Sequence, residues 1–284
     1  MTEKKLLINL FVGILLLFHA RTFVYSEENY PRRIISLGPA VTEGLYLLGT
    51  EDKIVGVTVY CQRPEEAKSK EKIGTVTEAN IERIMALEPD LVLATDLTNI
   101  RQIEKLKSLG LTVVTPFSYK DKNFTEICES FINLGRTVGR EEKAKEIVYK
   151  AKKKIASIQG RIKGLSRPRV VVQIGTRPLW IATKDSFIND FIKLAGGINI
   201  GPSGKNGLYS REKILEQNPD IIIIVTMGII GEEEKKFWEK YETINAAKNN
   251  RIYIVDSYKV CSPTPESFVD ALEEIVEIIH PEYK

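Results

Sequence analysis

The sequence predicts an α/β fold built from two βα lobes with mainly parallel sheets, joined by one long backbone helix. Two observations support this fold class. Short runs rich in β-branched residues alternate with helical patterns along the chain after Pro31, which is typical of βα units around a parallel sheet. In addition, a stretch of the second half repeats a stretch of the first half at a constant offset of 130 residues.

Seven short apolar runs are predicted to be strands. They are residues 34–37, 54–57, 91–94 and 111–115 in the first half, and residues 170–174, 221–225 and 252–255 in the second. Gly49, Gly110 and Gly196 follow the helical patterns between them, at positions where glycine commonly ends a helix.

The repeat consists of two segments in each half. Residues 82–84 (Glu-Arg-Ile) and 89–93 (Pro-Asp-Leu-Val-Leu) are matched by residues 212–214 (Glu-Lys-Ile) and 219–223 (Pro-Asp-Ile-Ile-Ile). In each copy a short helix ends before the proline, because a proline disfavours helical geometry in the preceding residue. A buried strand then begins after the aspartate. The repeat indicates two related lobes; the alternative is a chance similarity between two βα units.

The helical pattern at residues 141–163 separates the two halves. Its apolar residues recur every three or four positions and share one helical face: Ala144, Ile147, Ala151, Ile155, Ile158 and Ile162. We predict an N-terminal lobe at 31–140, a linker helix at 141–163 and a C-terminal lobe at 164–284. A helix of that length spans roughly 35 Å. It would restrict opening of the lobes more than flexible strands would. The alternative is an ordinary long surface helix.

Residues 1–26 have the pattern of a signal peptide. Lys4 and Lys5 precede an apolar run at 6–18, which is shorter than the roughly 20 residues of a membrane-spanning helix. We predict cleavage after Ser26, with an uncleaved anchor as the alternative. In either case the remainder is expected outside the cytosol, most simply in a periplasm. The first cysteine is Cys61, far from this site, so the segment does not predict a lipoprotein.

Charge and histidine content exclude several functions. The chain carries a net charge of +3, and the predicted signal peptide accounts for most of it, so nucleic acid is not expected as a partner. Only His280 lies outside that segment, which argues against multi-histidine metal sites and histidine-dependent catalysis. The chain contains neither a phosphate loop, nor a nucleophile elbow, nor a His-Glu-x-x-His motif. We therefore expect no enzyme activity and no metal held by the protein's own side chains.

Three cysteines cannot form a framework of several disulfides, and the odd number leaves at least one unpaired. Cys61 and Cys261 fall in predicted loops, where they can pair, offer a soft ligand to a metal or remain free thiols. Cys128 lies among Ile127, Phe131 and other apolar residues, which predicts a packed core position.

The loops after the predicted strands indicate where a ligand binds. In open α/β sheets, ligands bind outside the carboxyl ends of the strands. The loops at that edge are residues 38–43, 58–64, 175–180 and 256–263. If the two lobes face each other, these loops meet, so we predict a ligand cleft between the lobes.

Three motifs resemble one known family. They are residues 34–43 (Ile-Ile-Ser-Leu-Gly-Pro-Ala-Val-Thr-Glu), residues 80–84 followed by 89–92, and residues 247–253. With them, the chain from Arg32 onward resembles the periplasmic binding proteins for cobalamin, ferric siderophores and haem, and the spacing of its motifs is closest to the cobalamin-binding members. The resemblance implies a monomeric substrate-binding component of an ABC importer, with the importer's membrane permease subunits as partners.

The resemblance also implies the ligand. It would be a metal chelate, cobalamin or a related corrinoid, with a ferric siderophore or haem as alternatives, and the protein would need no cofactor of its own. By the resemblance, Tyr60 and Trp180 flank a flat macrocycle from opposite lobes, Asp256 accepts a hydrogen bond from ligand amides, and Pro39 and Tyr258 complete the ligand-binding set. The alternative for Tyr60 and Trp180 is a loop aromatic packed into its own lobe.

The chain departs from the cobalamin binders at three positions. Val76 and Asn206 replace aromatic residues, and Val260 stands in place of an arginine that contacts the ligand. The resemblance further implies that Glu82 and Glu212, one on each lobe, dock to arginines of the importer. Their matching positions in the repeat support this role; the alternative is ordinary solvated surface.

Overall fold

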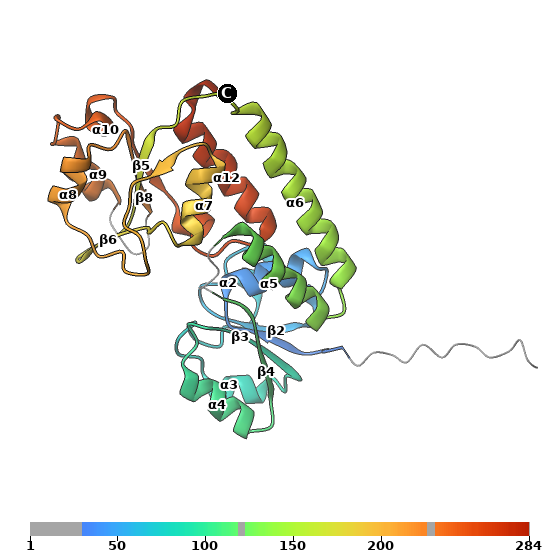
Figure 1. Ribbon diagram of the computed structural model, residues 1–284. Helices are drawn as coiled ribbons and strands as arrows, with labels where there is room; N and C mark the ends of the chain where they lie inside the picture. The colour runs from blue at the N-terminus through green and yellow to red at the C-terminus, as the bar shows by residue number, and fades with distance from the viewer. Residues whose placement is uncertain (1–29, 119–122, 226–230, 284) are drawn as a thin grey trace, which may run out of the picture. The chain divides into compact units, whose positions relative to one another are not determined.

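The computed structural model describes residues 30–118, 123–225 and 231–283 (Figure 1), and the predicted signal peptide lies outside them. Two sheets, each with its own helices, organise the chain from Pro31 onward. This confirms the predicted fold class of two α/β lobes with mainly parallel sheets.

The first sheet has the order β2-β1-β3-β4, and its pairs are parallel. Its strands are β1 (Ile34–Ser36), β2 (Ile54–Val57), β3 (Leu91–Thr95) and β4 (Thr112–Phe117). The helices around it are α2 (Pro39–Leu47), α3 (Ile81–Ala86), α4 (Ile100–Ser108) and α5 (Phe124–Thr137), with short 3-10 turns η1 (Glu51–Lys53) and η2 (Glu65–Ser69). All four predicted strands are present.

The second sheet has the order β6-β5-β8-β9, with β7 also paired to β5. Its strands are β5 (Arg169–Thr176), β6 (Leu179–Ile181), β7 (Ile198–Asn199), β8 (Ile221–Val225) and β9 (Ile252–Val255). Its helices are α7 (Phe187–Leu194), α8 (Arg211–Gln217), α9 (Gly231–Glu239), α10 (Asn245–Lys248), α11 (Ser257–Val260), α12 (Pro265–Ile279) and η3 (Pro281–Tyr283). The sequence did not predict β6 and β7, which are short strands of three and two residues paired with the longer β5.

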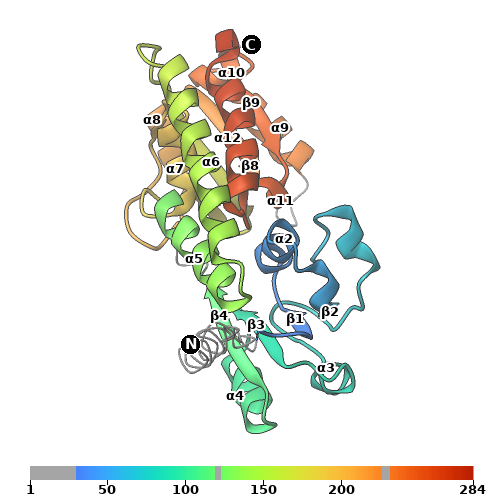
Figure 2. The same cartoon turned by 90° about the vertical axis from the view of Figure 1, so that its right-hand side faces the viewer.

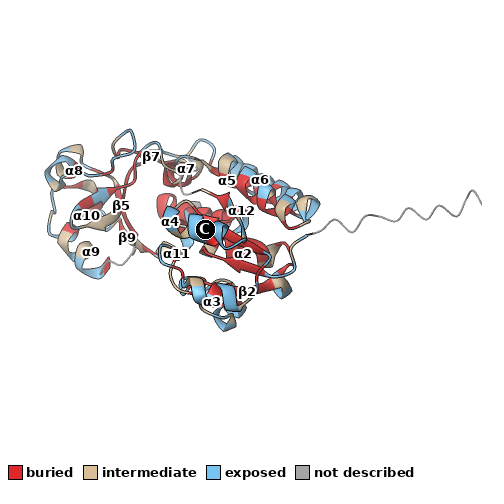
Figure 3. Ribbon diagram, turned by 90° about the horizontal axis from the view of Figure 1, so that it is seen from below, coloured by how far each residue is buried: buried red, intermediate tan, exposed pale blue. Residues whose placement is uncertain are grey.

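The predicted linker is helix α6 (Glu141–Arg161), which ends two residues before the predicted boundary. It buries the predicted apolar face and packs beside α5 and α12, as Figures 1 and 2 show from two directions. Lysines and glutamates occupy its other face, which is exposed in Figure 3. The periodicity therefore identified the buried side of this helix correctly.

The linker helix is not the sole connection between the two sheets. One continuous core cluster contains residues of both, such as Leu93 of β3 and Val172 of β5. Phe268 of α12 lies at its centre, 4.0 Å from the ring centroid of Phe191 on α7 and 4.7 Å from that of Phe124 on α5. Because these aromatic rings join elements from both halves, opening the lobes would disturb a packed core as well as bend a helix.

The repeat has the same local geometry in both lobes. Asp90 accepts hydrogen bonds from the backbone nitrogens of Arg32 and Arg33 at 2.7 and 3.0 Å. Asp220, at the equivalent position, accepts one from the backbone nitrogen of Arg169 at 2.8 Å. Each aspartate thus ties the start of its own strand to the start of the neighbouring one. The residues two positions earlier, Glu88 and Asn218, adopt φ angles of 45° and 46°. Two copies of one structural plan explain this agreement.

Candidate ligand-binding site

The predicted ligand-binding residues lie where the strands end. Pro39 is the first residue of α2 and half-buried, directly after β1. A Cβ atom on its predecessor Gly38 would lie 2.5 Å from Cγ2 of the buried Thr95, so a larger residue there would have to displace that side chain. The close contact lets α2 begin against the end of β3, at the carboxyl edge of the sheet.

Tyr60 and Trp180 are both partly exposed aromatic residues. Tyr60 follows β2 and is 47% exposed, and its neighbour Val59 is 43% exposed. Trp180 lies in β6 and is 36% exposed; it pairs with Leu208, which is 52% exposed. Each lobe thus presents an apolar pair near its strand ends, which we call the Val59–Tyr60 pair and the Trp180–Leu208 pair.

Trp180 also packs within its own lobe. Its indole lies against Gly207, where a Cβ atom would be 2.5 Å from the indole nitrogen Nε1. Part of the ring is therefore covered by the 207–208 segment, and part remains exposed. Trp180 therefore lies beside the strand ends with one part of its ring packed within its lobe and another part exposed.

The segment 256–263 carries Asp256 and Tyr258. Asp256 is exposed and caps the short helix α11, accepting a hydrogen bond from the backbone nitrogen of Tyr258 at 2.9 Å. Tyr258 itself is half-buried. Val260 is buried, so the side chain at this position packs into the core.

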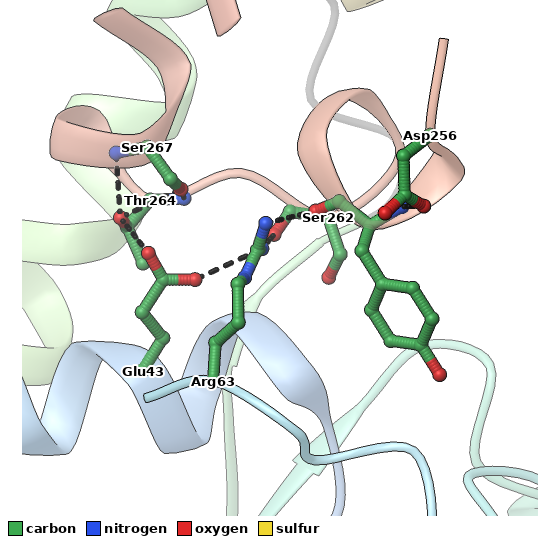
Figure 4. A network of polar contacts seen from close by, with 7 residues as sticks. Glu43, Arg63, Asp256, Ser262, Thr264 and Ser267 are labelled. Carbon is green, nitrogen blue, oxygen red and sulfur yellow. Dashed lines mark hydrogen bonds and ion pairs between the residues drawn. The ribbon is translucent and has the colours of Figure 1, made fainter. Parts of the chain in front are cut away.

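A polar network joins this segment to the N-terminal lobe (Figure 4). The guanidinium of Arg63 donates hydrogen bonds to the carbonyl oxygens of Tyr258 and Ser262, the latter at 3.3 Å. It also forms an ion pair with Glu43 of α2 at 2.9 Å. The hydroxyl of Thr264 donates to the other carboxylate oxygen of Glu43 at 3.1 Å. Two of the predicted cleft loops, 58–64 and 256–263, therefore meet, as the sequence predicted.

A small cavity lies beside this contact. Its volume is about 30 Å³, and residues of both lobes line it: Ala40, Thr95, Phe117, Ser118, Ile127, Phe187, Cys261, Ser262 and Pro263. This volume is close to that of one water molecule. A macrocycle would therefore lie outside this cavity, against the exposed loop residues.

Cys61 lies in the loop 58–64 as predicted and is a free thiol, the third of the three alternatives that the sequence left open. Its side chain is fully buried, and its sulfur accepts a hydrogen bond from the Thr42 hydroxyl at 3.0 Å and lies 3.2 Å from that of Thr58. Burial raises the pKa of this thiol. Cys61 and Cys261 are both free, so they do not pair, and Cys128 is buried as predicted. Burial also raises the pKa of Cys261 to about 12, and the nearby charge of Asp256 adds to this effect.

Burial raises the pKa of Glu43 above its ordinary value of 4.5, although Arg63 and the hydroxyls of Ser267 and Thr264 oppose the shift. Because the folded protein holds this proton more tightly than the unfolded chain, the contribution of Glu43 to stability is full below pH 4.5 and is lost as the pH rises through the raised pKa. We expect the unfolding free energy of the wild type, relative to Glu43→Gln, to fall over that interval. Urea unfolding of both proteins between pH 4 and pH 8 measures this; parallel pH profiles would contradict it.

The two predicted docking residues occupy equivalent exposed positions. Glu82 lies in the first turn of α3, and Glu212 in the first turn of α8. The side chains of Asn80 and Ser210 cap the two helices, each accepting a hydrogen bond from the backbone nitrogen three residues later. Both carboxylates are therefore held on rigid, capped helix starts. Their role in docking remains a prediction.

Within the described ranges, the structure contains no cluster of three or more histidine, cysteine, aspartate or glutamate side chains able to hold a metal. None of the helices described is long and apolar enough to cross a membrane.

Comparison with known proteins relates this chain to periplasmic and ABC transporter substrate-binding proteins. The family model for the periplasmic binding proteins matches residues 34–259. An uncharacterized ABC transporter substrate-binding lipoprotein of Bacillus subtilis is 32% identical over 262 residues, covering 89% of this chain and 81% of that protein. A vitamin B12-binding protein of Photorhabdus laumondii is 28% identical over 234 residues, covering 81% of this chain and 82% of that protein.

A solved structure adds the fold. The crystal structure of a possible iron-binding (periplasmic solute-binding) protein from Staphylococcus epidermidis superposes with a TM-score of 0.77 at 30% identity, covering 88% of this chain and 99% of that one. The match of the family model over most of the chain, together with this shared fold, shows that the chain belongs to the periplasmic binding protein family.

Proposed function

We propose that this protein is the substrate-binding component of an ABC importer and that it captures a metal chelate, most simply cobalamin or a related corrinoid. The observation that carries the proposal is the presence of one exposed apolar pair on each lobe, Val59–Tyr60 and Trp180–Leu208, near the strand ends where ligands bind in α/β folds. Aromatic faces bury large flat surfaces at low entropic cost, which suits a planar macrocycle.

The similarity to proteins named for vitamin B12 binding supports the choice of corrinoid. Such proteins match this chain at 28–29% identity over 72–81% of its length. Asp256 adds a hydrogen-bond acceptor suited to the amide groups around a corrin ring, since it is exposed on the segment 256–263.

An iron chelate is the second candidate. The possible iron-binding protein from Staphylococcus epidermidis is 30% identical to this chain. For haem, the exposed phenol of Tyr60 can serve as an axial ligand. His280 cannot, because it is buried against Gly196.

The proposal includes export by the N-terminal segment 1–26 to the periplasm and docking as a monomer to permease subunits. The protein would need no cofactor of its own, since the cobalt or iron belongs to the transported ligand. It would perform no catalysis.

Native mass spectrometry and absorption spectra of the purified protein test the ligand. The protein is mixed in separate samples with cyanocobalamin, a ferric hydroxamate siderophore and haemin. We expect a one-to-one complex with cyanocobalamin and a perturbed corrin spectrum. If the protein binds only the siderophore or only haemin, that compound and not a corrinoid is its ligand. If it binds none of the three, the proposal that it captures a metal chelate is overturned.

A further inference from the structure

We propose that Arg63 is a positioning residue of the ligand site: it holds the segment 256–263, which carries Asp256 and Tyr258, against helix α2 of the other lobe. The proposal rests on the function proposed above. Arg63 itself does not need to touch the ligand. Its guanidinium lies between acceptors of the two lobes, as Figure 4 shows.

The segment depends on contacts outside itself. Helix α11 has four residues, too few for an isolated helix to be stable. Its start is capped by Asp256, and Lys259 forms an ion pair at 2.6 Å with Glu274 of α12. Both of these contacts are exposed and made within the same lobe. Arg63 adds side-chain hydrogen bonds from the N-terminal lobe to two backbone carbonyls of the segment.

The guanidinium of Arg63 contacts the segment 256–263 at two places. One terminal nitrogen donates to the carbonyl of Tyr258, inside α11, and the other to the carbonyl of Ser262, after the helix has ended. Hydrogen bonds from a charged donor are roughly twice as strong as neutral ones. By holding two carbonyls four residues apart, Arg63 limits both the position and the rotation of α11.

Glu43 holds Arg63 in turn. Its carboxylate is nearly buried and receives Arg63 on one oxygen and the Thr264 hydroxyl on the other. Thr264 belongs to the capping box of α12, with Ser267 as its partner. The network therefore runs from the loop after β2, through α2, to the start of α12. Its anchoring points are the middle of α2, through Glu43, and the capped start of α12, through Thr264.

The substitution Arg63→Lys distinguishes the positioning effect of the guanidinium from the effect of its positive charge, because lysine keeps the charge. An ammonium group in place of Arg63 can retain the ion pair with Glu43, but it lacks the planar fork that reaches a carboxylate and two carbonyls at once. Arg63→Lys should therefore keep the fold and loosen α11. The matched control is Arg136→Lys, because Arg136 forms an exposed ion pair with Glu141 away from the strand ends.

The experiment has two measurements on the wild type and both variants. Hydrogen exchange of the ligand-free protein, followed by mass spectrometry, reports the peptide covering residues 256–263. Calorimetry reports the affinity for cyanocobalamin. In Arg63→Lys we expect faster exchange in that peptide, unchanged exchange in β5 and β8, and affinity reduced about ten-fold, which corresponds to losing one charge-assisted hydrogen bond. The control should match the wild type in both measurements.

The outcomes distinguish this proposal from the proposed function. If the wild type fails to bind cyanocobalamin, haemin and the siderophore, the proposed function fails, and the exchange measurement still decides whether Arg63 holds α11. Wild-type exchange in Arg63→Lys would overturn the proposal, as would faster exchange with unchanged affinity for a ligand that the wild type binds. Faster exchange throughout the protein would reduce Arg63 to a general contributor to stability.

Discussion

Replacing either Tyr60 or Trp180 with alanine is expected to weaken corrinoid binding about ten- to a hundred-fold. The physical reason is the loss of one apolar wall: burial of an aromatic side chain contributes about 1.5 to 3 kcal/mol, and each 1.4 kcal/mol is a factor of ten in affinity. Both rings are partly exposed in the protein without ligand, so neither substitution removes a core residue. Calorimetry with cyanocobalamin measures the affinity.

Tyr149→Ala is the matched control for this prediction. Tyr149 is an exposed aromatic residue, 68% exposed on the linker helix α6, remote in the fold from the strand ends. Its loss should leave affinity unchanged. If both Tyr60→Ala and Trp180→Ala also bind with wild-type affinity, the two rings are ordinary loop residues packed on their own lobes.

Reversing both predicted docking charges, Glu82→Lys with Glu212→Lys, is expected to reduce uptake at least about ten-fold, since like charges placed opposite each other across an interface cost several kcal/mol. Ligand affinity should stay near that of the wild type, because both residues start helices on their lobes and take no part in the contacts at the strand ends. The measurements are uptake into vesicles carrying the importer and calorimetry in solution. The uptake defect relative to the wild type should shrink as ionic strength rises, because salt screens both the attraction in the wild type and the repulsion in the variant.

A second double variant controls for net charge. Glu129→Lys with Glu142→Lys changes the charge by the same amount at exposed positions on α5 and α6. It should leave uptake unchanged. Equal loss of uptake in the two double variants would assign the effect to net charge, and loss of ligand affinity in parallel with uptake would remove Glu82 and Glu212 from a docking role.

The predicted ligand residues rest on the family resemblance and on the loops after the strands, whereas the contacts that hold those loops could not be predicted from the sequence. Thr264 followed by Pro265 can be recognised from sequence as a helix start before an apolar run, and the structure shows Thr264 and Ser267 as a capping box. That the same threonine would also bind Glu43, 221 residues away, has no local signal. The same holds for Gln173, a polar residue within an apolar strand. Its amide donates to Glu234 and accepts from the indole of Trp238, both at 2.7 Å.

The sequence by itself determined the features that have a periodic pattern of apolar residues or an internal repeat. Short apolar runs identified seven of the nine described strands, spacing by three and four identified the buried face of α6, and the offset of 130 residues identified two copies of one unit. The strands and the helix face depend on side chains a few positions apart, which propensity and burial control directly, and the repeat is visible by comparing one stretch of sequence with another.

Only the tertiary structure decided which side chains meet. It buried the side chain of Cys61 although the residue lies in a loop, and it joined the halves through the rings around Phe268 as well as through α6. It also placed Arg63 against the carbonyls of Tyr258 and Ser262, across nearly 200 residues of chain. Such contacts depend on how two sheets and their helices pack around one core. A buried polar group forms hydrogen bonds with whichever partners the packing brings close, and these partners can lie far away along the sequence.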